Sequence, residues 1–112
     1  MNKIIFVVIF MAFLGSIGQL LFKKASDSIS FDITSLIFNK WLILGLFFYG
    51  LATLGYVISL KYGDLSVLYP IIAFSYIFVA VLSWKFLGES MTIQKIIGSI
   101  GIILSVGMIN YG

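Results

Sequence analysis

Three polar side chains follow one face of the first apolar run of the sequence. Ser16, Gln19 and Lys23 stand at i, i+3 and i+7, a spacing that places them on one side of a helix. A glutamine surrounded by hydrocarbon needs a hydrogen-bond partner, and a lysine near a membrane surface can contact an anion. The stripe therefore predicts a binding site, with Gln19 as its mid-membrane contact and Lys23 at the membrane surface. Two plainer interpretations stay open, in which Gln19 bonds a neighbouring helix and Lys23 only anchors the run.

Aromatic and hydroxyl side chains repeat at helical spacing in two later apolar runs. Tyr49, Thr53 and Tyr56 share one helical face, and Tyr69 and Tyr76 share another. Such stripes more often pack against neighbouring helices than contact a ligand, but three runs that each carry one could line a single cavity. We therefore predict that these five residues bind a substrate together with the polar stripe of the first run.

Pro70 stands inside the third apolar run, between the two tyrosines of that run. Proline has no backbone N–H to donate, so it removes one helical hydrogen bond. Such a gap is tolerated in a membrane where neighbouring groups or water satisfy the freed carbonyl. We predict a kink or hinge at this position.

The remaining chemistry-bearing residues offer little for catalysis. The chain has no cysteine and no histidine, so a thiolate or imidazole metal site lacks its ligands. The four acids, Asp27, Asp32, Asp64 and Glu89, all lie between apolar runs. Because a general base must lie within hydrogen-bond reach of the group it deprotonates, we expect no enzyme, no metal and no cofactor.

The composition indicates where these side chains must work. Of the 112 residues, 62% are hydrophobic and 10% charged, with a mean hydropathy of +1.19, whereas soluble domains contain roughly 25% charged residues. Four apolar runs are each close to the roughly 20 residues that cross a bilayer; they cover residues 4–22, 41–60, 65–86 and 93–109. We predict an all-α integral membrane protein, with four transmembrane helices in a single domain over residues 1–112.

The ends of the runs support these boundaries. Trp41, Tyr62, Trp84 and Tyr111 stand there, as expected of the aromatic belts at the two membrane surfaces. The first run could also be a cleaved signal peptide, with Gly15 and Ser16 as its small residues. Because three more runs follow, a retained first helix is the simpler interpretation.

Lysines are distributed unevenly between the two predicted membrane faces. Lys3 and Lys61 fall on one face, and five fall on the other: Lys23, Lys24, Lys40, Lys85 and Lys95. Because lysine-rich connections stay in the cytoplasm, this distribution favours both termini outside it.

Small residues mark a possible contact face on the fourth run. Gly98, Gly101 and Ser105 follow one another at helical spacing, and small residues let helices approach closely in lipid. The face could pack within the chain or against a second subunit. We favour the second interpretation, and predict a homodimer or a heterodimer with a related four-span subunit.

Short motifs resemble a known family of transporters. Leu87-Gly88-Glu89, Ile97-Gly98 and Tyr69-Pro70 resemble the repeat of the drug/metabolite transporter superfamily (EamA-like). Gly15 to Leu20, followed by Lys23 and Ala25, is similar to the first helix of the aminoarabinose-lipid flippase subunits. This resemblance implies a multi-pass subunit in a bacterial or archaeal inner membrane, which flips an undecaprenyl-phosphate-linked sugar or a similar anionic amphiphile. The resemblance also implies that Lys23 faces the phosphate of this substrate. The partners would then be membrane lipid and the polyprenyl-phosphate glycolipid, and not nucleic acid.

The small multidrug resistance family is a more distant resemblance. Its fourth helix resembles residues 96–110, but its first helix has a glutamate where this chain has Gly15. Without a carboxylate in the bilayer, a proton-coupled exporter of small organic cations is the second hypothesis. A non-transporting scaffold subunit is the third.

Overall fold

The computed structural model describes residues 2–30 and 32–111, and within them every regular element is helical. Residues 1, 31 and 112 of the predicted domain lie outside the described ranges. Four helical segments are long and apolar enough to cross a membrane, over Lys3–Ser26, Lys40–Ser59, Leu65–Leu87 and Ile93–Tyr111. The predicted fold class, an all-α chain with four potential transmembrane helices, is confirmed.

The first two spans are helices α1 (Asn2–Ser26) and α3 (Lys40–Ser59), which are joined through the short helix α2 (Ile33–Ile37). Asp32 caps α2 by accepting a hydrogen bond from the Thr34 amide at 3.2 Å. Asn39 caps α3 by accepting from the amides of Trp41 and Leu42, and its side-chain amide donates to the Ala25 carbonyl oxygen. The same asparagine therefore starts α3 and fastens it to the end of α1.

The third span consists of three pieces: α4 (Leu65–Ile71), α5 (Phe74–Leu82) and the π-helical turn η1 (Ser83–Leu87). The helix is interrupted at Ile72 and Ala73, shortly after Pro70. The predicted kink or hinge at Pro70 stays a prediction. Gly88 ends the span with a φ of 72°, a left-handed conformation that glycine adopts without steric cost. Helix α6 (Ile93–Tyr111) is the fourth span.

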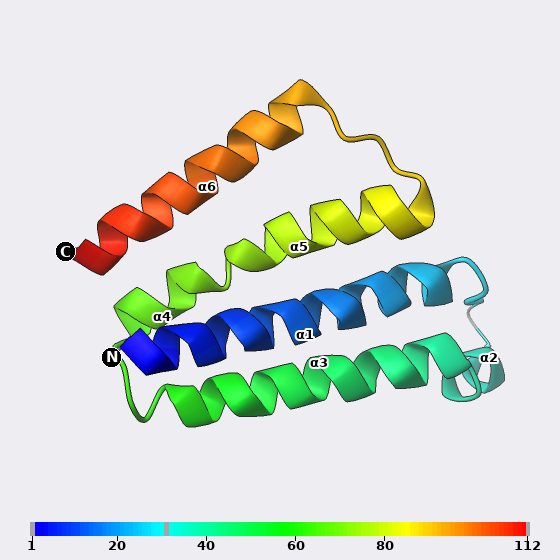
Figure 1. Ribbon diagram of the computed structural model, residues 1–112. Helices are drawn as coiled ribbons and strands as arrows, with labels where there is room; N and C mark the ends of the chain where they lie inside the picture. The colour runs from blue at the N-terminus through cyan, green and yellow to red at the C-terminus, as the bar shows by residue number, and fades with distance from the viewer. Residues whose placement is uncertain (1, 31, 112) are drawn as a thin grey trace.

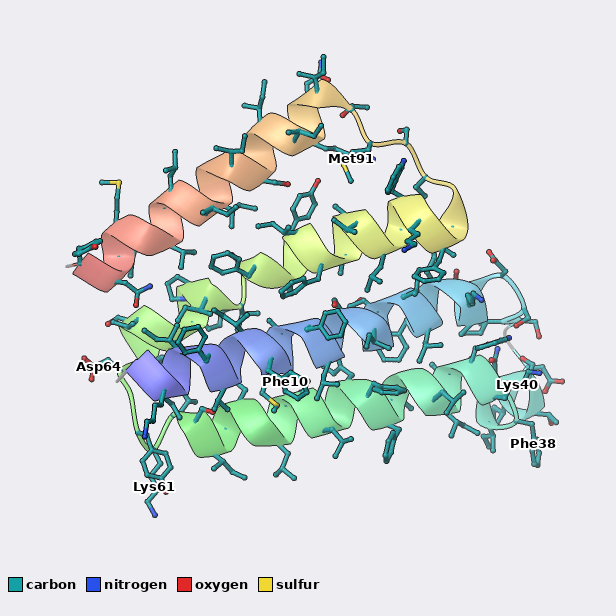
Figure 2. The ribbon with its side chains drawn as sticks, in the orientation of Figure 1. Phe10, Phe38, Lys40, Lys61, Asp64 and Met91 are labelled. Carbon is teal, nitrogen blue, oxygen red and sulfur yellow. The ribbon has the colours of Figure 1, made fainter. Side chains whose placement is uncertain are left out.

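The spans lie in a row and not in a square bundle. Helix α1 contacts α3 on one side and α4 and α5 on the other, while α6 contacts α4 and α5 (Figure 1). The described chain measures 48 × 36 × 19 Å, and its long dimension matches the roughly 40–45 Å of a bilayer with its headgroups. Lys61 and Asp64 lie at one end of the helices, and Phe38 and Lys40 lie at the opposite end (Figure 2).

Small residues form the seam between α1 and α3. Gly45, Ala52 and Ser59 are buried on α3 at intervals of seven residues, the repeat of helices that stay in contact over several turns. A β-carbon placed on Gly18 of α1 would lie 3.0 Å from the Gly45 carbonyl oxygen and 3.1 Å from the Tyr49 amide nitrogen. At this point the two backbones leave no room for a side chain.

Most large apolar side chains point away from the other helices. Phe6, Ile93 and Met108, for example, are each more than 70% exposed. Water would make such a surface unfavourable, whereas lipid solvates it. A compact apolar cluster is buried only where α1, α4 and α6 meet, around Val8, Leu68, Ile71 and Val106.

We predict that Gly18→Leu lowers the free energy of unfolding by about 1–3 kcal/mol, the usual cost of overpacking, because the new side chain must separate α1 from α3. Gly50→Leu on the same helix pair is the matched control, since a β-carbon at Gly50 meets no atom within 4 Å. Denaturant titration in mixed micelles measures both. Equal stability of the two variants would contradict the assignment of Gly18 to the seam.

Candidate functional site

A groove with a volume of about 330 Å³ runs over α1, between α3 and the broken third span. Helix α1 forms its floor, α3 one wall, and the segment around the interruption of the third span the other. Its lining residues are Val8, Met11, Ala12, Gly15, Gln19, Tyr49, Ala52, Thr53, Tyr56, Tyr69, Ile72 and Ser75. Gln19, Tyr49, Thr53, Tyr56 and Tyr69 are among the eight predicted binding residues, so the structure brings five of them together.

The chemistry of the described lining is polar but uncharged. Its polar groups are one amide, from Gln19, and hydroxyls from three tyrosines, Thr53 and Ser75, set among alkyl groups. Amides and hydroxyls both donate and accept hydrogen bonds. Because no water competes inside a bilayer, such groups can hold an uncharged polar ligand, while no described lining residue has a charge to offer an ion.

The seam between α1 and α3 sets the depth of this groove. A β-carbon at Gly15 would touch that of Ala52 at 3.6 Å, so small residues keep the floor close to the wall. Tyr49 lies one turn from Ala52 on α3, and its ring packs against the ring of Phe22 of α1, with the two centroids 5.9 Å apart. The polar faces of the two helices can therefore share one space, because Gly15 and Ala52 let the helices approach closely beneath it.

Tyr56 borders this groove, and its hydroxyl is buried. Its ring packs beside the apolar cluster of Val8, Leu68 and Ile71, and its oxygen has no hydrogen-bond partner among the described residues. A buried polar group without a partner costs roughly 1–3 kcal/mol, so such a group commonly marks a strained or functional position.

The interruption after Pro70 decides which side chains of the third span reach the groove. Hydrogen bonds from the amides of Ile72, Ala73, Ser75 and Tyr76 reach back only three residues. Each residue of such a tight turn advances by about 120°, against about 100° in an α-helix. Ser75 therefore lines the groove beside Tyr69, whereas Tyr76 lies in a different space between α5 and α6.

Ser16 and Lys23 also lie apart from the groove. Ser16 is fully buried, and its hydroxyl donates to the Phe13 carbonyl oxygen of the preceding turn at 2.6 Å. Lys23 is exposed in the last turn of α1, at the membrane-surface end of the helix. Its predicted contact with a phosphate stays a prediction, as does substrate binding by all eight residues.

Gln19 lies exposed on the groove side of α1. Among the described residues, no hydrogen bond joins its amide to a neighbouring helix, so the interpretation of Gln19 as an interhelical link within the chain gains no support. The amide is instead placed to meet a group that enters the groove.

The small face of α6 is open. Gly98, Gly101 and Ser105 are all exposed, and a β-carbon on either glycine meets no atom within 4 Å. These residues therefore do not serve close packing within the described chain, and their contact with a second subunit stays a prediction.

Sequence reasoning missed Ser75 and the small residues of the groove floor. The floor was visible as spacing, because Val8, Ala12, Gly15 and Gln19 follow one another at intervals of three or four. No sequence signal pointed to Ser75, because its direction depends on the interruption of the helix.

The comparison with known families agrees with this architecture. The EamA-like transporter family matches residues 2–111, nearly the whole chain. The chain belongs to this family. No curated protein and no solved structure matches it significantly.

Membership in the EamA-like transporter family places the chain among membrane transporters. Together with the four apolar helices, it identifies a multi-pass membrane protein. For a transporter, a polar groove between transmembrane helices has a direct use, because it gives a polar solute hydrogen-bond partners at a depth where lipid offers none.

We predict that Tyr56→Phe raises the free energy of unfolding of the ligand-free chain by about 1 kcal/mol, because it removes a buried hydroxyl that lacks a partner. Tyr69→Phe is the matched control, since Tyr69 is 65% exposed and should change little. Denaturant titration in micelles compares them. A clear loss of stability in Tyr56→Phe would show that this hydroxyl is bonded within the protein, and would remove it from the site.

Proposed function

We propose that the chain is a transporter subunit that flips an undecaprenyl-phosphate-linked sugar, or a similar anionic amphiphile, across a bacterial or archaeal inner membrane. The supporting observation is the uncharged polar lining of the groove over α1. A sugar presents several hydroxyls and no charge of its own, so amide and hydroxyl side chains suit it. The groove is open along one side, where a lipid tail can remain in the bilayer while the head crosses.

The phosphate of such a substrate needs cations at the membrane surface. Lys23 and Lys24 lie in the last turn of α1, and Lys24 also packs its ammonium 4.9 Å from the centre of the Trp41 ring. Lys85 lies in the π-helical turn that ends the third span. In this proposal Lys23 contacts the phosphate, because its charge stands one turn beyond Gln19 on the groove side of α1.

A second candidate is the export of small organic cations coupled to protons. Tyr49, Tyr56 and Tyr69 all border the groove, and aromatic rings attract quaternary ammonium groups through their electron-rich faces. The described lining contains no carboxylate that could release a proton as the cation binds, which counts against this candidate.

We expect purified chain in vesicles to accelerate flipping of a radiolabelled undecaprenyl-phosphate sugar, with the predicted partner subunit supplied if needed. Gln19→Leu and Lys23→Gln should each slow flipping about 2- to 10-fold, the equivalent of one lost hydrogen bond or charge contact. Lys3→Gln, at the opposite end of α1, is the control and should not change the rate.

The outcomes separate the hypotheses. Flipping that is unchanged in Lys23→Gln would make Lys23 an anchor only. Uptake of a quaternary ammonium ion driven by a pH gradient, without glycolipid movement, would favour the second candidate. If the protein moves neither a polyprenyl lipid nor a cation, the remaining hypothesis is a scaffold subunit that does not transport.

We also propose that the working unit is a dimer, either with a second copy or with a related four-span subunit. A row of helices gives the groove a floor and two walls but leaves one side open. Transporter sites commonly form between two repeats, and a second subunit would supply the missing side. The open face of Gly98, Gly101 and Ser105 lets the partner approach α6 closely.

Gly101→Leu should lower the dimer fraction at least several-fold without unfolding the subunit, because the leucine occupies the space of the partner helix. Gly107→Leu is the control, because it makes the same change on the side of α6 opposite to Gly98. Subunit photobleaching in bilayers counts the copies. A dimer indifferent to Gly101→Leu would place the contact elsewhere, and a monomeric wild type that transports would refute the dimer.

A further inference from the structure

A second groove, with a volume of about 380 Å³, lies between α5 and α6. Tyr76 borders it from α5, and Gln94, Lys95, Gly98 and Ile102 border it from α6. It shares no lining residue with the groove over α1. Helix α6 meets α4 near its carboxyl end and diverges from α5 towards its amino end (Figure 1).

This second groove is polar at one end and apolar along its length. Gln94 and Lys95 stand in the first turn of α6, at the level of the membrane surface. Gly98 and Ile102 follow one and two turns deeper, and Ile102 lies about 10 Å further along the axis than Lys95, at 1.5 Å per residue. Since a β-carbon at Gly98 would meet no atom within 4 Å, the floor of the groove is free of side chains at that point.

Lys95 is the only charged residue among those that line the second groove in the described chain. Its side chain is half-buried, and its ammonium donates a hydrogen bond to the Ser90 carbonyl oxygen at 2.7 Å. An ammonium has three N–H donors, so one such bond fixes the position of the charge and leaves two donors for an anion. The Ser90 contact therefore holds a cation at the mouth of an otherwise uncharged groove.

We infer that this groove binds an anionic phospholipid, with its phosphate at Lys95 and an acyl chain along Gly98 and Ile102. Basic pockets between transmembrane helices are suited to anionic headgroups. Lys95 lies at the predicted membrane face that holds five of the seven lysines. Gly98 also belongs to the small face proposed for the partner subunit. The lipid occupies the part of α6 that borders α5, from Lys95 to Ile102, and the partner helix contacts Gly101 and Ser105, which do not line this groove. The lipid belongs to the leaflet at the lysine-rich end, and it fills the space where α6 diverges from α5.

The test compares lipid binding to the full chain by native mass spectrometry from detergent, with phosphatidylglycerol and phosphatidylcholine as probes. Wild type should retain phosphatidylglycerol in preference to phosphatidylcholine. Lys95→Gln should weaken phosphatidylglycerol binding about fivefold, as expected for one lysine at a lipid surface, and Lys95→Arg should restore it. Lys40→Gln is the matched control, since it removes the same charge at the same end from an exposed residue outside the groove.

Four results would overturn the inference. Equal retention of the two lipids would show that charge does not select the occupant. Equal weakening by Lys40→Gln would indicate general surface attraction. Displacement of the lipid by inorganic phosphate would assign the site to a free anion. A changed dimer fraction in Lys95→Gln, with lipid retention intact, would make the groove a contact for a partner helix.

Discussion

The close approach of α1 and α3 at Gly18 and Gly45 is the contact on which the rest of the structure depends. In lipid the hydrophobic effect contributes little to helix association, so close packing and polar contacts must hold the helices together. The seam provides the packing over several turns, through Gly45, Ala52 and Ser59. It also places the polar faces of two helices side by side, so that Gln19 and Thr53 border one groove.

The third span shows how a break in regular structure can shape the same groove. Pro70 precedes a short stretch in which amides bond back three residues instead of four. As a result, Tyr69 and Ser75 face the groove over α1, while Tyr76 faces α6. The span thereby borders two separate grooves, one beside α1 and one beside α6. In the functions proposed above, the first groove holds the solute and the second holds a lipid of the surrounding membrane.

The positions of the four spans could be predicted from the sequence, because runs of about 20 apolar residues have few alternatives to crossing a bilayer. It was also sufficient for the polar faces of continuous helices, as Gln19, Tyr49, Thr53 and Tyr56 show. It was not sufficient where the direction of a side chain depends on something other than helical spacing. Ser16 bonds to its own helix, and the interruption of the third span turns Ser75 towards the groove in place of Tyr76. Composition and motif length could not identify the substrate.

In the proposed function, the groove over α1 is the route of the transported head group. Protection of single cysteines by the substrate tests this directly. Because the chain has no cysteine of its own, Thr53→Cys places one thiol in the groove, and Ile58→Cys places one on the outward side of the same helix, where Ile58 is 57% exposed. The measurement is the rate of thiol labelling with and without an undecaprenyl-phosphate sugar. We expect the glycolipid to slow the labelling of Thr53→Cys and to leave the labelling rate of Ile58→Cys unchanged. Equal labelling rates of Thr53→Cys with and without the glycolipid, in a preparation that flips the glycolipid, would show that the head group does not pass through this groove.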